Sequence, residues 1–336
     1  MKGLTQLLWR ARTKDEQRLM VSFWLVGILA AVVVGVGSPP HLVGDEGRYL
    51  HYAENLTQGF YVKADHPDFT NGPGYPLILA PFVAMKAPWW MMRGCNVVFL
   101  LGAMWFMYQT VRIWCSPRWA LVAALVLALN PVLFRYMGQM KTEVLSTMLF
   151  AGFLWSYVRV LQAQRWAGKR MLVCVGFLFA LIMVRVLFGY VAMAGMVVLP
   201  LFLWISGQMT RWKAATAPLG GALILCLPWL VYTHHYTEKF PCWSTNGGEL
   251  FYWMTSPYPE EWGSWFSYEE ATFRPEIAQH HGDFLHRVEA LPFAEREAVY
   301  LEQAKMHLAE HPQAFVRNLT ANVSRILFSF PRSYYS

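Results

Sequence analysis

Long apolar runs alternate with short polar segments along this chain, which is the pattern of a polytopic helical membrane protein. The run between Met171 and Trp204 is too long for one helix and contains Arg185, so it predicts two spans. The other runs, each predicting one span, are 19–37, 96–114, 119–134, 144–161, 217–232 and the weaker 313–330. The pattern therefore predicts an all-α bundle of about eight transmembrane helices.

The apolar segment 75–90 is short and contains three prolines. If it crossed the membrane, the basic clusters 112–118 and 159–170 would lie outside, against the rule that Lys and Arg gather on the cytoplasmic side. If it re-enters or lies at the interface, both clusters lie inside, and Glu143 and Arg185 lie outside. We therefore predict a re-entrant or interfacial helix here, and a cytoplasmic N-terminus.

The polar stretches between the spans predict smaller elements on the outer side. Helical spacing of apolar positions predicts a short amphipathic helix at the interface, from Asp45 to Gly59. A second helix opens at Pro292 and stops before Pro312. The chain thus divides into a transmembrane core at 1–233 with a catalytic first outer loop at 38–76, an extracytoplasmic loop region at 234–312, and a final span with a short tail at 313–336.

Composition supports a membrane protein and argues against a nucleic-acid-binding one. Of the 336 residues, 56% are hydrophobic and only 15% are charged, whereas a soluble chain usually carries about 25% charged residues. The formal net charge is +7, but the Lys and Arg residues gather in short loops beside the apolar runs. We therefore expect the lipid bilayer as a partner and no nucleic acid.

Neither the cysteines nor the histidines point to a cofactor. Four of the five cysteines lie in or beside apolar runs, and only Cys242 falls in a long polar region, so no disulfide framework is predicted. The histidine pairs 234–235 and 280–281 lack metal-ligand spacing, and we interpret them as exposed loop histidines. We predict no metal site and assign no cofactor; a divalent cation stays open but has no support in the sequence.

The stretch Gly44–Tyr49 carries the first candidate chemistry, because it places Asp45 and Glu46 side by side, close to lipid, with Arg48 one turn away. Crowded carboxylates in a partly dry site raise the pKa of one of them, as a general base requires. An Asp at a helix start is also a favoured N-cap. Both interpretations of Asp45 stay open from these local features.

Two further ionisable residues lie at predicted span ends. Glu143 is either a functional acid or half of a structural pair with Lys141. The Arg185 side chain could bind a phosphate at the lipid boundary through bidentate hydrogen bonds. It could equally be a snorkelling arginine whose guanidinium reaches the lipid headgroups. The sequence favours a functional role for Glu143 and leaves both alternatives open for Arg185.

In their order and spacing, several short motifs resemble the GT-C superfamily of membrane glycosyltransferases. The resemblance is strongest to the protein O-mannosyltransferase-like branch (family 39), which includes the lipid A aminoarabinose transferases. The motifs run from about Leu19 to Pro331 and include Asp45-Glu46-x-Arg48-Tyr49, Gly72-Pro73-Gly74-Tyr75-Pro76-Leu77, Asn130-Pro131, Gln139 to Glu143, Arg185, Thr245 to Gly248, and His311-Pro312 with Asn318, Arg325 and Phe330-Pro331.

The resemblance implies transfer, with inversion, of a sugar from a polyprenyl-phosphate donor to a lipid, glycan or protein acceptor. It implies a GT-C-like bundle in a bacterial inner (plasma) membrane, with the active site on the extracytoplasmic side. The residue roles that it implies are Asp45 and Glu143 as catalytic acids, Glu46, Arg48 and Tyr49 as their support, and Arg185, Lys141, Asn71, Gly72 and Tyr75 at the donor.

Two departures from that branch leave alternatives open. The aminoarabinose transferases carry a charged residue before the proline of the second motif, where this chain has Gly72. Members of the branch continue with further spans, whereas this sequence ends at Ser336. The alternatives are therefore a transporter or flippase of lipid-linked substrates, or a catalytically incomplete partner subunit. A transporter would be expected to show inverted repeats, and none is found.

Overall fold

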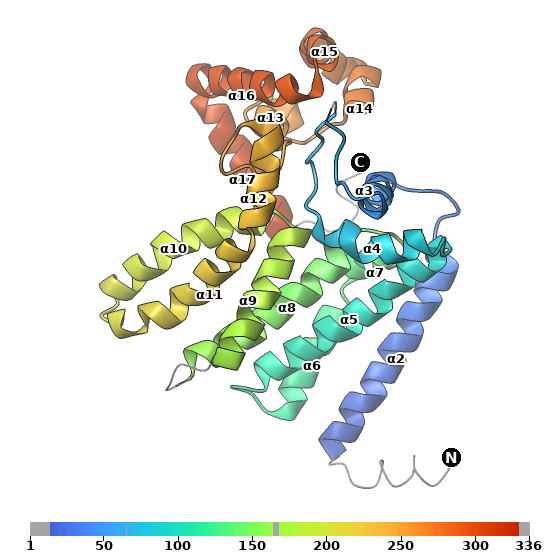
Figure 1. The fold of residues 1–336 in the computed structure, drawn as a ribbon, viewed down its shortest axis with the longest axis vertical. Helices are drawn as coiled ribbons and strands as arrows, with labels where there is room; N and C mark the ends of the chain where they lie inside the picture. Colours follow the sequence, from blue (N-terminus) through green and yellow to red (C-terminus); the bar gives the residue numbers. More distant parts are fainter. Residues whose placement is uncertain (1–13, 65, 164–167, 329–336) are drawn as a thin grey trace. The chain divides into compact units, whose positions relative to one another are not determined.

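The computed structural model describes residues 14–64, 66–163 and 168–328, and within these ranges it is helical, with no sheet and one isolated bridge between Lys63 and His66. The chain forms two compact units (Figure 1). Unit 1 comprises Met1–Tyr61 and Asn71–Trp229, and unit 2 comprises Val62–Thr70 and Leu230–Ser336. The predicted all-α class is confirmed.

Unit 1 is built from long helices that pack side by side, among them α5 with α8, α8 with α9, and α10 with α11 (Figure 1). Its elements are α2 (Lys14–Gly37), α3 (Glu46–Thr57), α4 (Gly74–Ala84), α5 (Trp89–Val111), α6 (Pro117–Ala128), α7 (Pro131–Met137), α8 (Thr142–Leu161), α9 (Gly168–Val184), α10 (Leu187–Ile205), η1 (Met209–Arg211) and α11 (Trp212–Leu225). Helix α12 (Leu227–Thr237) begins in unit 1 and continues in unit 2. On α6, Ala120, Ala124 and Ala128 are fully buried, and such small side chains let helices approach closely.

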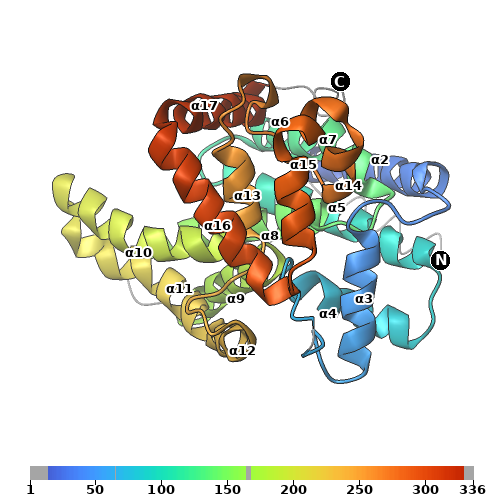
Figure 2. The ribbon, with the colours of Figure 1, turned by 90° about the horizontal axis from the view of Figure 1, so that it is seen from above.

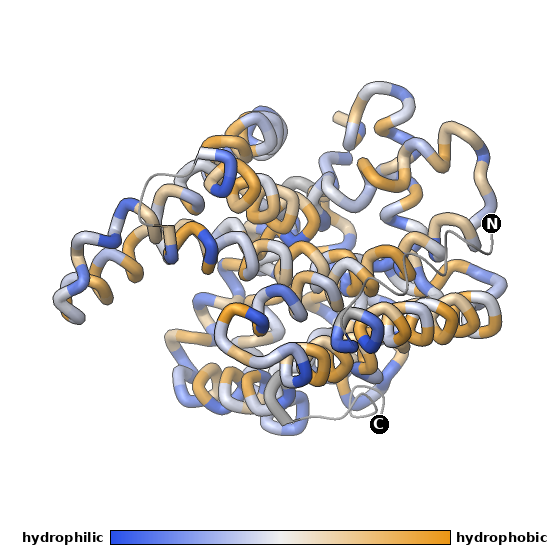
Figure 3. The backbone as a smooth tube through the Cα atoms, turned by 90° about the horizontal axis from the view of Figure 1, so that it is seen from below, coloured by the Kyte–Doolittle hydropathy of each residue, from blue (hydrophilic) through white to orange (hydrophobic). Residues whose placement is uncertain are grey.

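Four described helices are long and apolar enough to cross a membrane, namely α2, α5, α8 and α10. The number rises to six if two bent pairs, α6 with α7 and η1–α11 with α12, each form one span. Hydrophobic residues run along the long helices, while hydrophilic residues are concentrated nearer their ends (Figure 3). The chain is therefore an integral membrane protein, and the expected total of eight spans stays a prediction.

The predicted runs 119–134 and 217–232 are not continuous helices. The first breaks into α6 and α7 with a bend of 51°, because Pro131 has no amide hydrogen to continue the helix. The side chain of Asn130 accepts a hydrogen bond of 2.9 Å from the amide of Val132 and so caps the start of α7. The second run breaks at Cys226, between α11 and α12.

Helices α3 and α4 occupy the segments predicted as interfacial or re-entrant. Helix α4 has 11 residues and is therefore about 17 Å long, well short of the roughly 30 Å needed to cross the hydrocarbon core. Helix α3 buries Tyr49, Leu50 and Tyr52 against its surroundings in unit 1, as its amphipathic pattern predicts.

Unit 2 packs its helices around an aromatic core that includes Tyr252, Trp253, Ile277 and Leu285. Its elements are the remainder of α12, then α13 (Gly247–Met254), η2 (Pro259–Glu261), α14 (Tyr268–Phe273), α15 (Pro275–Glu289), α16 (Phe293–Glu310) and α17 (Pro312–Phe328). Helix α16 lies along α13 (Figure 2) and has the bounds expected from Pro292 and Pro312.

Helix α17 covers most of the predicted final span, but it is not among the helices that qualify as spans. Its polar side packs on the protein, where Asn318 donates to the carbonyl groups of Met254 and Ser256. Its apolar residues Val316 and Leu319 are exposed instead. Residues 329–330 of that predicted span lie outside the described ranges.

Candidate functional site

Asp45 stands at the N-cap position of α3, but its side chain makes no capping hydrogen bond. The preceding Gly44 has φ +59°, a left-handed conformation that glycine adopts without strain. One carboxylate oxygen of Asp45 lies 3.4 Å from the guanidinium of Arg48, and about half of the side chain is exposed, at 49%. The side chain of Asp45 is therefore open to further partners.

Glu46 is completely buried and belongs to a different environment. Its carboxylate accepts two hydrogen bonds of 3.1 Å from Arg93. It also accepts from the backbone amides of Val43, at 2.7 Å, and Met140, at 2.6 Å. The charge of Glu46 is thus balanced by Arg93. The sequence suggested that Glu46 crowds Asp45, but the Glu46 carboxylate is bonded to Arg93 in the protein interior instead.

Arg93 and Asn96 are buried polar residues of α5 that the sequence analysis missed. Arg93 also donates to the carbonyl oxygens of Pro39, at 2.6 Å, and His41, at 3.2 Å. The amide of Asn96 donates to the backbone carbonyls of residues 136, 137 and 139. The available signal was a polar pair inside the apolar helix α5, since polar groups at membrane depth are costly unless they are bonded.

Tyr49 lies at the centre of the candidate residues. Its hydroxyl group accepts a hydrogen bond of 3.2 Å from the amide of Asn71 and is hydrogen-bonded to Thr142. Burial raises the pKa of Tyr49 to about 12, and the charges of Asp45, Arg185 and Glu143 all act on it as well. The Tyr49 hydroxyl therefore lies within electrostatic reach of both candidate acids and of the candidate phosphate-binding arginine.

Glu143 pairs with Arg185, not with Lys141. A carboxylate oxygen of Glu143 lies 2.8 Å from the guanidinium of Arg185, which is 43% exposed. The other oxygen, Oε2, is buried and accepts no hydrogen bond from the described residues. The ammonium of Lys141 lies over the ring of Tyr136, 5.3 Å from its centre, and beside Gly44, 3.4 Å from where a Cβ would stand.

The Gly72–Gly74 turn packs backbone against backbone on the end of α9. A Cβ at Gly72 would lie 2.3 Å from the carbonyl oxygen of Met183, and one at Gly74 would lie 2.7 Å from the amide nitrogen of Val184. No larger residue fits at either position without displacement. This close approach brings the turn beside the residues that lead directly into Arg185.

Asn71 and Tyr75 flank this turn and tie it to α3. The side-chain oxygen of Asn71 accepts from Arg48 at 3.3 Å, and its carbonyl accepts from the hydroxyl of Tyr61 at 2.8 Å. Tyr75 is buried and packs edge-to-face on Tyr49, with ring centres 5.1 Å apart. Unit 1 therefore holds the candidate residues in one connected group: Asp45, Glu46, Arg48, Tyr49, Asn71, Gly72, Tyr75, Lys141, Glu143 and Arg185.

This group combines two partly exposed carboxylates with nearby cations and hydrogen-bond donors. A carboxylate can accept a proton from a nucleophile, and an open guanidinium can bind a phosphate. Among the described residues, no group of three or more His, Cys, Asp or Glu side chains is arranged to hold a metal ion.

Unit 2 contains a second polar cluster, in which Ser256 donates to Glu261, and His281 bridges Glu261 and Tyr252. All four side chains are buried. The interpretation of the two histidine pairs as loop residues was therefore wrong, since 234–235 lie on α12 and 280–281 lie on α15. Exposure was also wrong for His281, which is 1% exposed. Helix formation from Pro275 turns His281 toward the core, which its polar neighbours in sequence concealed.

The pKa of Glu261 is lowered even though it is buried. Burial acts to raise the pKa, whereas the hydrogen bonds from His281 and Ser256 act to lower it, and the net shift is downward. The cluster is thus a satisfied network in a protein interior.

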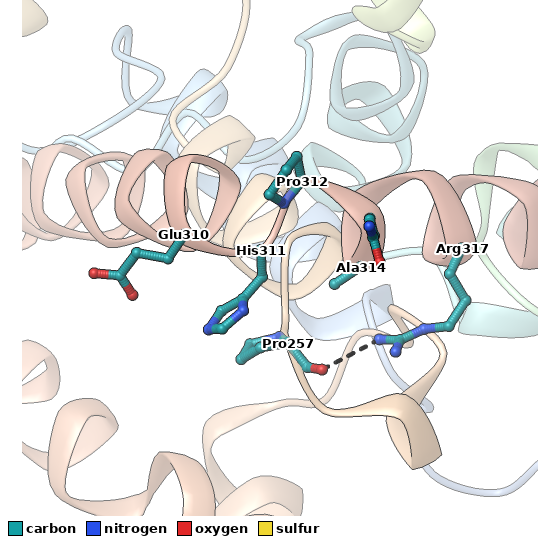
Figure 4. A pocket seen from close by; sticks show the side chains of 7 residues that line it. Pro257, Glu310, His311, Pro312, Ala314 and Arg317 are labelled. Atoms are coloured by element: carbon teal, nitrogen blue, oxygen red, sulfur yellow. Dashed lines mark hydrogen bonds between the residues drawn. The ribbon is translucent and has the colours of Figure 1, made fainter.

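A separate cavity of about 580 Å³ in unit 2 lies at the junction of α16 and α17 (Figure 4). It is lined by Pro257, Glu310, His311, Pro312, Gln313, Ala314 and Arg317. Arg317 is already engaged, because it donates to the carbonyl oxygens of residues 256, 257 and 258. None of the predicted site residues lines this cavity.

Comparison with known families gives one match, to the family described as dolichyl-phosphate-mannose-protein mannosyltransferase, over residues 65–232. The matched range contains Asn71 to Tyr75, Lys141, Glu143 and Arg185, and it begins after Asp45. No curated protein matches the chain.

Proposed function

The chain belongs to the family of dolichyl-phosphate-mannose-protein mannosyltransferases, and from this premise we propose that sugar transfer takes place at the residues around Tyr49. The protein is an integral membrane glycosyltransferase that uses a polyprenyl-phosphate sugar donor. The family's reaction is glycosyl transfer, which favours this function over transport of lipid-linked substrates.

Asp45 is the proposed general base. The acceptor's hydroxyl or amine loses its proton to the Asp45 carboxylate as its lone pair attacks the anomeric carbon of the sugar. The bond from that carbon to the phosphate oxygen breaks, and the electron pair leaves with the lipid phosphate. Attack opposite the leaving group inverts the anomeric carbon. Half-exposure of Asp45 supports this role, because an acceptor can reach it.

Arg185 and Lys141 are the proposed partners of the donor phosphate. The leaving phosphate gains negative charge in the transition state, and fixed cations stabilise that charge most where water is scarce. Glu143 holds Arg185 at 2.8 Å and so fixes its guanidinium in position. Because the guanidinium is partly exposed, it keeps donors for a second anion.

The remaining residues keep these groups in place. Glu46 and Arg93 fix the start of α3 to the loop before α8, and Asn71 links Arg48 to Tyr49. Reactants held in a fixed geometry gain much of their rate from positioning. We place this site on the extracytoplasmic side of a bundle of about eight spans, with the N-terminus in the cytoplasm.

The observation that carries the proposal is that three charged residues, 42 to 140 positions apart in the sequence, act on one tyrosine. Asp45, Glu143 and Arg185 all act electrostatically on Tyr49, and the buried Oε2 of Glu143 has no hydrogen-bond partner among the described residues. Buried polar atoms without a partner are uncommon and often belong to functional sites.

The direct test is sugar transfer by the full chain in detergent from a panel of polyprenyl-phosphate sugars, comparing wild type with Asp45→Asn. Loss of a general base lowers turnover by about 10²- to 10⁴-fold. The matched control is Glu54→Gln, which removes one negative charge from an exposed position on the same helix. Unchanged turnover in Asp45→Asn, with Glu54→Gln also active, would exclude Asp45 as the base.

A further inference from the structure

Helix α17 of unit 2, dark red in Figure 2, leaves an apolar face uncovered. Val316, Leu319 and Val323 recur at intervals of three and four residues, so they share one face of the helix. Their exposed fractions are 61%, 42% and 46%. The hydroxyl of Thr320, on the same side, already donates to the carbonyl of Val316 at 2.8 Å. The face therefore presents mainly apolar surface to whatever lies beside it.

Hydrogen bonds from the other side of α17 fix this orientation. Asn318 is fully buried and donates to the carbonyl oxygens of Met254, at 3.1 Å, and Ser256, at 2.9 Å. One turn further on, Asn322 donates to the carbonyl of Gly263 at 3.2 Å. Rotating the helix to bury its apolar face would leave the Asn318 amide unpaired, which costs about 1–3 kcal/mol. The apolar face is therefore held outward.

The neighbouring helices of unit 2 have the reverse arrangement. Helix α15 buries Ile277, Leu285 and Val288, and α16 buries Tyr300 and Ala304, all in the aromatic core. An amphipathic helix whose outer side meets water normally packs its apolar face inward in this way. Helix α17 turns its apolar face the other way, which indicates that its outer neighbour is apolar.

A tryptophan that lies along α17 fits a lipid neighbour. The carbonyl of Trp262 accepts hydrogen bonds of 3.3 Å from Asn322 and Arg325, and its side chain is 48% exposed. Its backbone has φ +53°, which is uncommon for so large a residue. The next residue packs closely on the helix, since a Cβ at Gly263 would lie 2.7 Å from the Cβ of Asn318. Tryptophan favours the headgroup level of a bilayer, and α17 carries two arginines but no Asp or Glu.

A bilayer adjoins unit 2 through the helix that joins it to unit 1. The longer segment of unit 2 begins at Leu230, inside α12, and α12 is the second half of a bent candidate span. Val231 on that helix is 62% exposed, as a lipid-facing residue would be. Lipid is therefore an apolar partner within reach of this unit.

We infer that α17 lies along the bilayer surface, with Val316, Leu319 and Val323 buried at the boundary between headgroups and acyl chains. Such a helix sinks its apolar face about 5–10 Å into the bilayer, while the other side of α17 stays bonded to unit 2. A surface helix thus replaces the final span that the sequence predicts and leaves the other predicted spans unchanged. The inference does not depend on the proposed transfer reaction.

Electron paramagnetic resonance of the full chain in phosphatidylcholine nanodiscs tests this. The background carries Cys95→Ala and Cys115→Ala, because these are the two cysteines that are not buried. A nitroxide is attached through Leu319→Cys, or through Asp283→Cys at an exposed position on α15 as the control. The ratio of collisions with oxygen to collisions with a nickel chelate should be several-fold higher at 319 than at 283, because the polar chelate avoids hydrocarbon. Equal ratios would overturn the inference.

Two further arms separate a surface helix from the other arrangements. Ser324 is exposed on a neighbouring side of α17, so a label at Ser324→Cys should lie shallower than one at Leu319→Cys. Equal depth at both positions would mean that the helix crosses the bilayer, and the inference would fail. The protection at 319 should also persist in discs that hold one chain. If it needed two chains, and the labels broadened each other's spectra, a second copy would cover the face instead of lipid.

Discussion

The two units each bury a glutamate, and the two glutamates are stabilised in different ways. Glu46 in unit 1 is held by Arg93 and two backbone amides. Glu261 in unit 2 is held by the neutral or titratable groups of Ser256 and His281. An arginine side chain keeps its charge across the working pH range, whereas a histidine does not. Glu46 is therefore held by a permanent cation, whereas hydrogen bonds from Ser256 and His281 act to lower the pKa of Glu261.

The surroundings of the two clusters differ as much as their partners. Asp45 directly precedes the buried Glu46 in the chain and is half-exposed, so an accessible acid stands beside a buried, paired one. In unit 2, Tyr252 and His281 are as buried as Glu261 itself. The interior of unit 2 thus contains a hydrogen-bonded set of Ser, Glu, His and Tyr, which are residue types that suggest catalysis. Accessibility, more than residue type, separates the candidate site from the core.

Among the substitutions that test this comparison, Arg93→Met is expected to lower the stability of the protein most. It leaves Glu46 charged and buried without its cation, which costs about 3–5 kcal/mol of stability. Thermal unfolding of the detergent-solubilised chain measures the loss. The double variant Glu46→Gln/Arg93→Met should recover part of it, because no uncompensated charge remains. A single variant as stable as wild type would contradict the supporting role of the pair.

Gly72→Ala tests whether the turn at 72–74 positions the site. The added methyl group would meet the carbonyl of Met183, so the turn and the segment leading to Arg185 must separate. A displacement of about 1 Å can lower a reaction rate roughly 10²-fold, and the transfer assay measures it. The control is Gly94→Ala, where a Cβ meets nothing within 4 Å; equal activity in the two variants would show that the close approach has no role.

His281→Ala tests the claim that the unit 2 cluster is structural. Glu261 and Tyr252 would both lose a partner, which costs about 1–3 kcal/mol. Stability should fall, while transfer per folded molecule should stay near the wild-type value. A large loss of transfer at unchanged stability would place the cluster in the reaction and remove the distinction between the two units.

The smallest expected effect is a pH dependence of the free energy of unfolding of unit 2 at acidic pH. Because the folded-state pKa of Glu261 lies below its ordinary value of 4.5, the unfolded chain takes up a proton first as the pH falls. The stabilisation is complete above pH 4.5 and is lost as the pH drops through the lower folded value. Unfolding midpoints measured from neutral to acidic pH should show this component in wild type and lack it in Glu261→Gln, with Glu54→Gln as the exposed control.

The sequence by itself determined the helical class and the membrane setting, and it supplied the candidate site residues. Runs such as Leu187–Ile205 are apolar over a span's length, and only a helix satisfies its own backbone in lipid. The order of the Asp45 and Gly72–Gly74 motifs located candidate residues, because short local patterns survive in the linear chain. The sequence did not predict the helix breaks at Asn130 and Cys226. A single proline or turn changes the direction of an apolar run without changing its composition.

Only the tertiary structure decided which neighbours in sequence are neighbours in space. Asp45 and Glu46 are adjacent along the chain, yet one is exposed and the other is bonded to Arg93, 47 positions away. Glu143, in the first turn of α8, pairs with Arg185, which directly follows α9, instead of with Lys141. His281 is polar in a polar stretch and still enters the core. Long-range partners decide these outcomes, because the energy of a buried charge depends on what surrounds it and not on what precedes it.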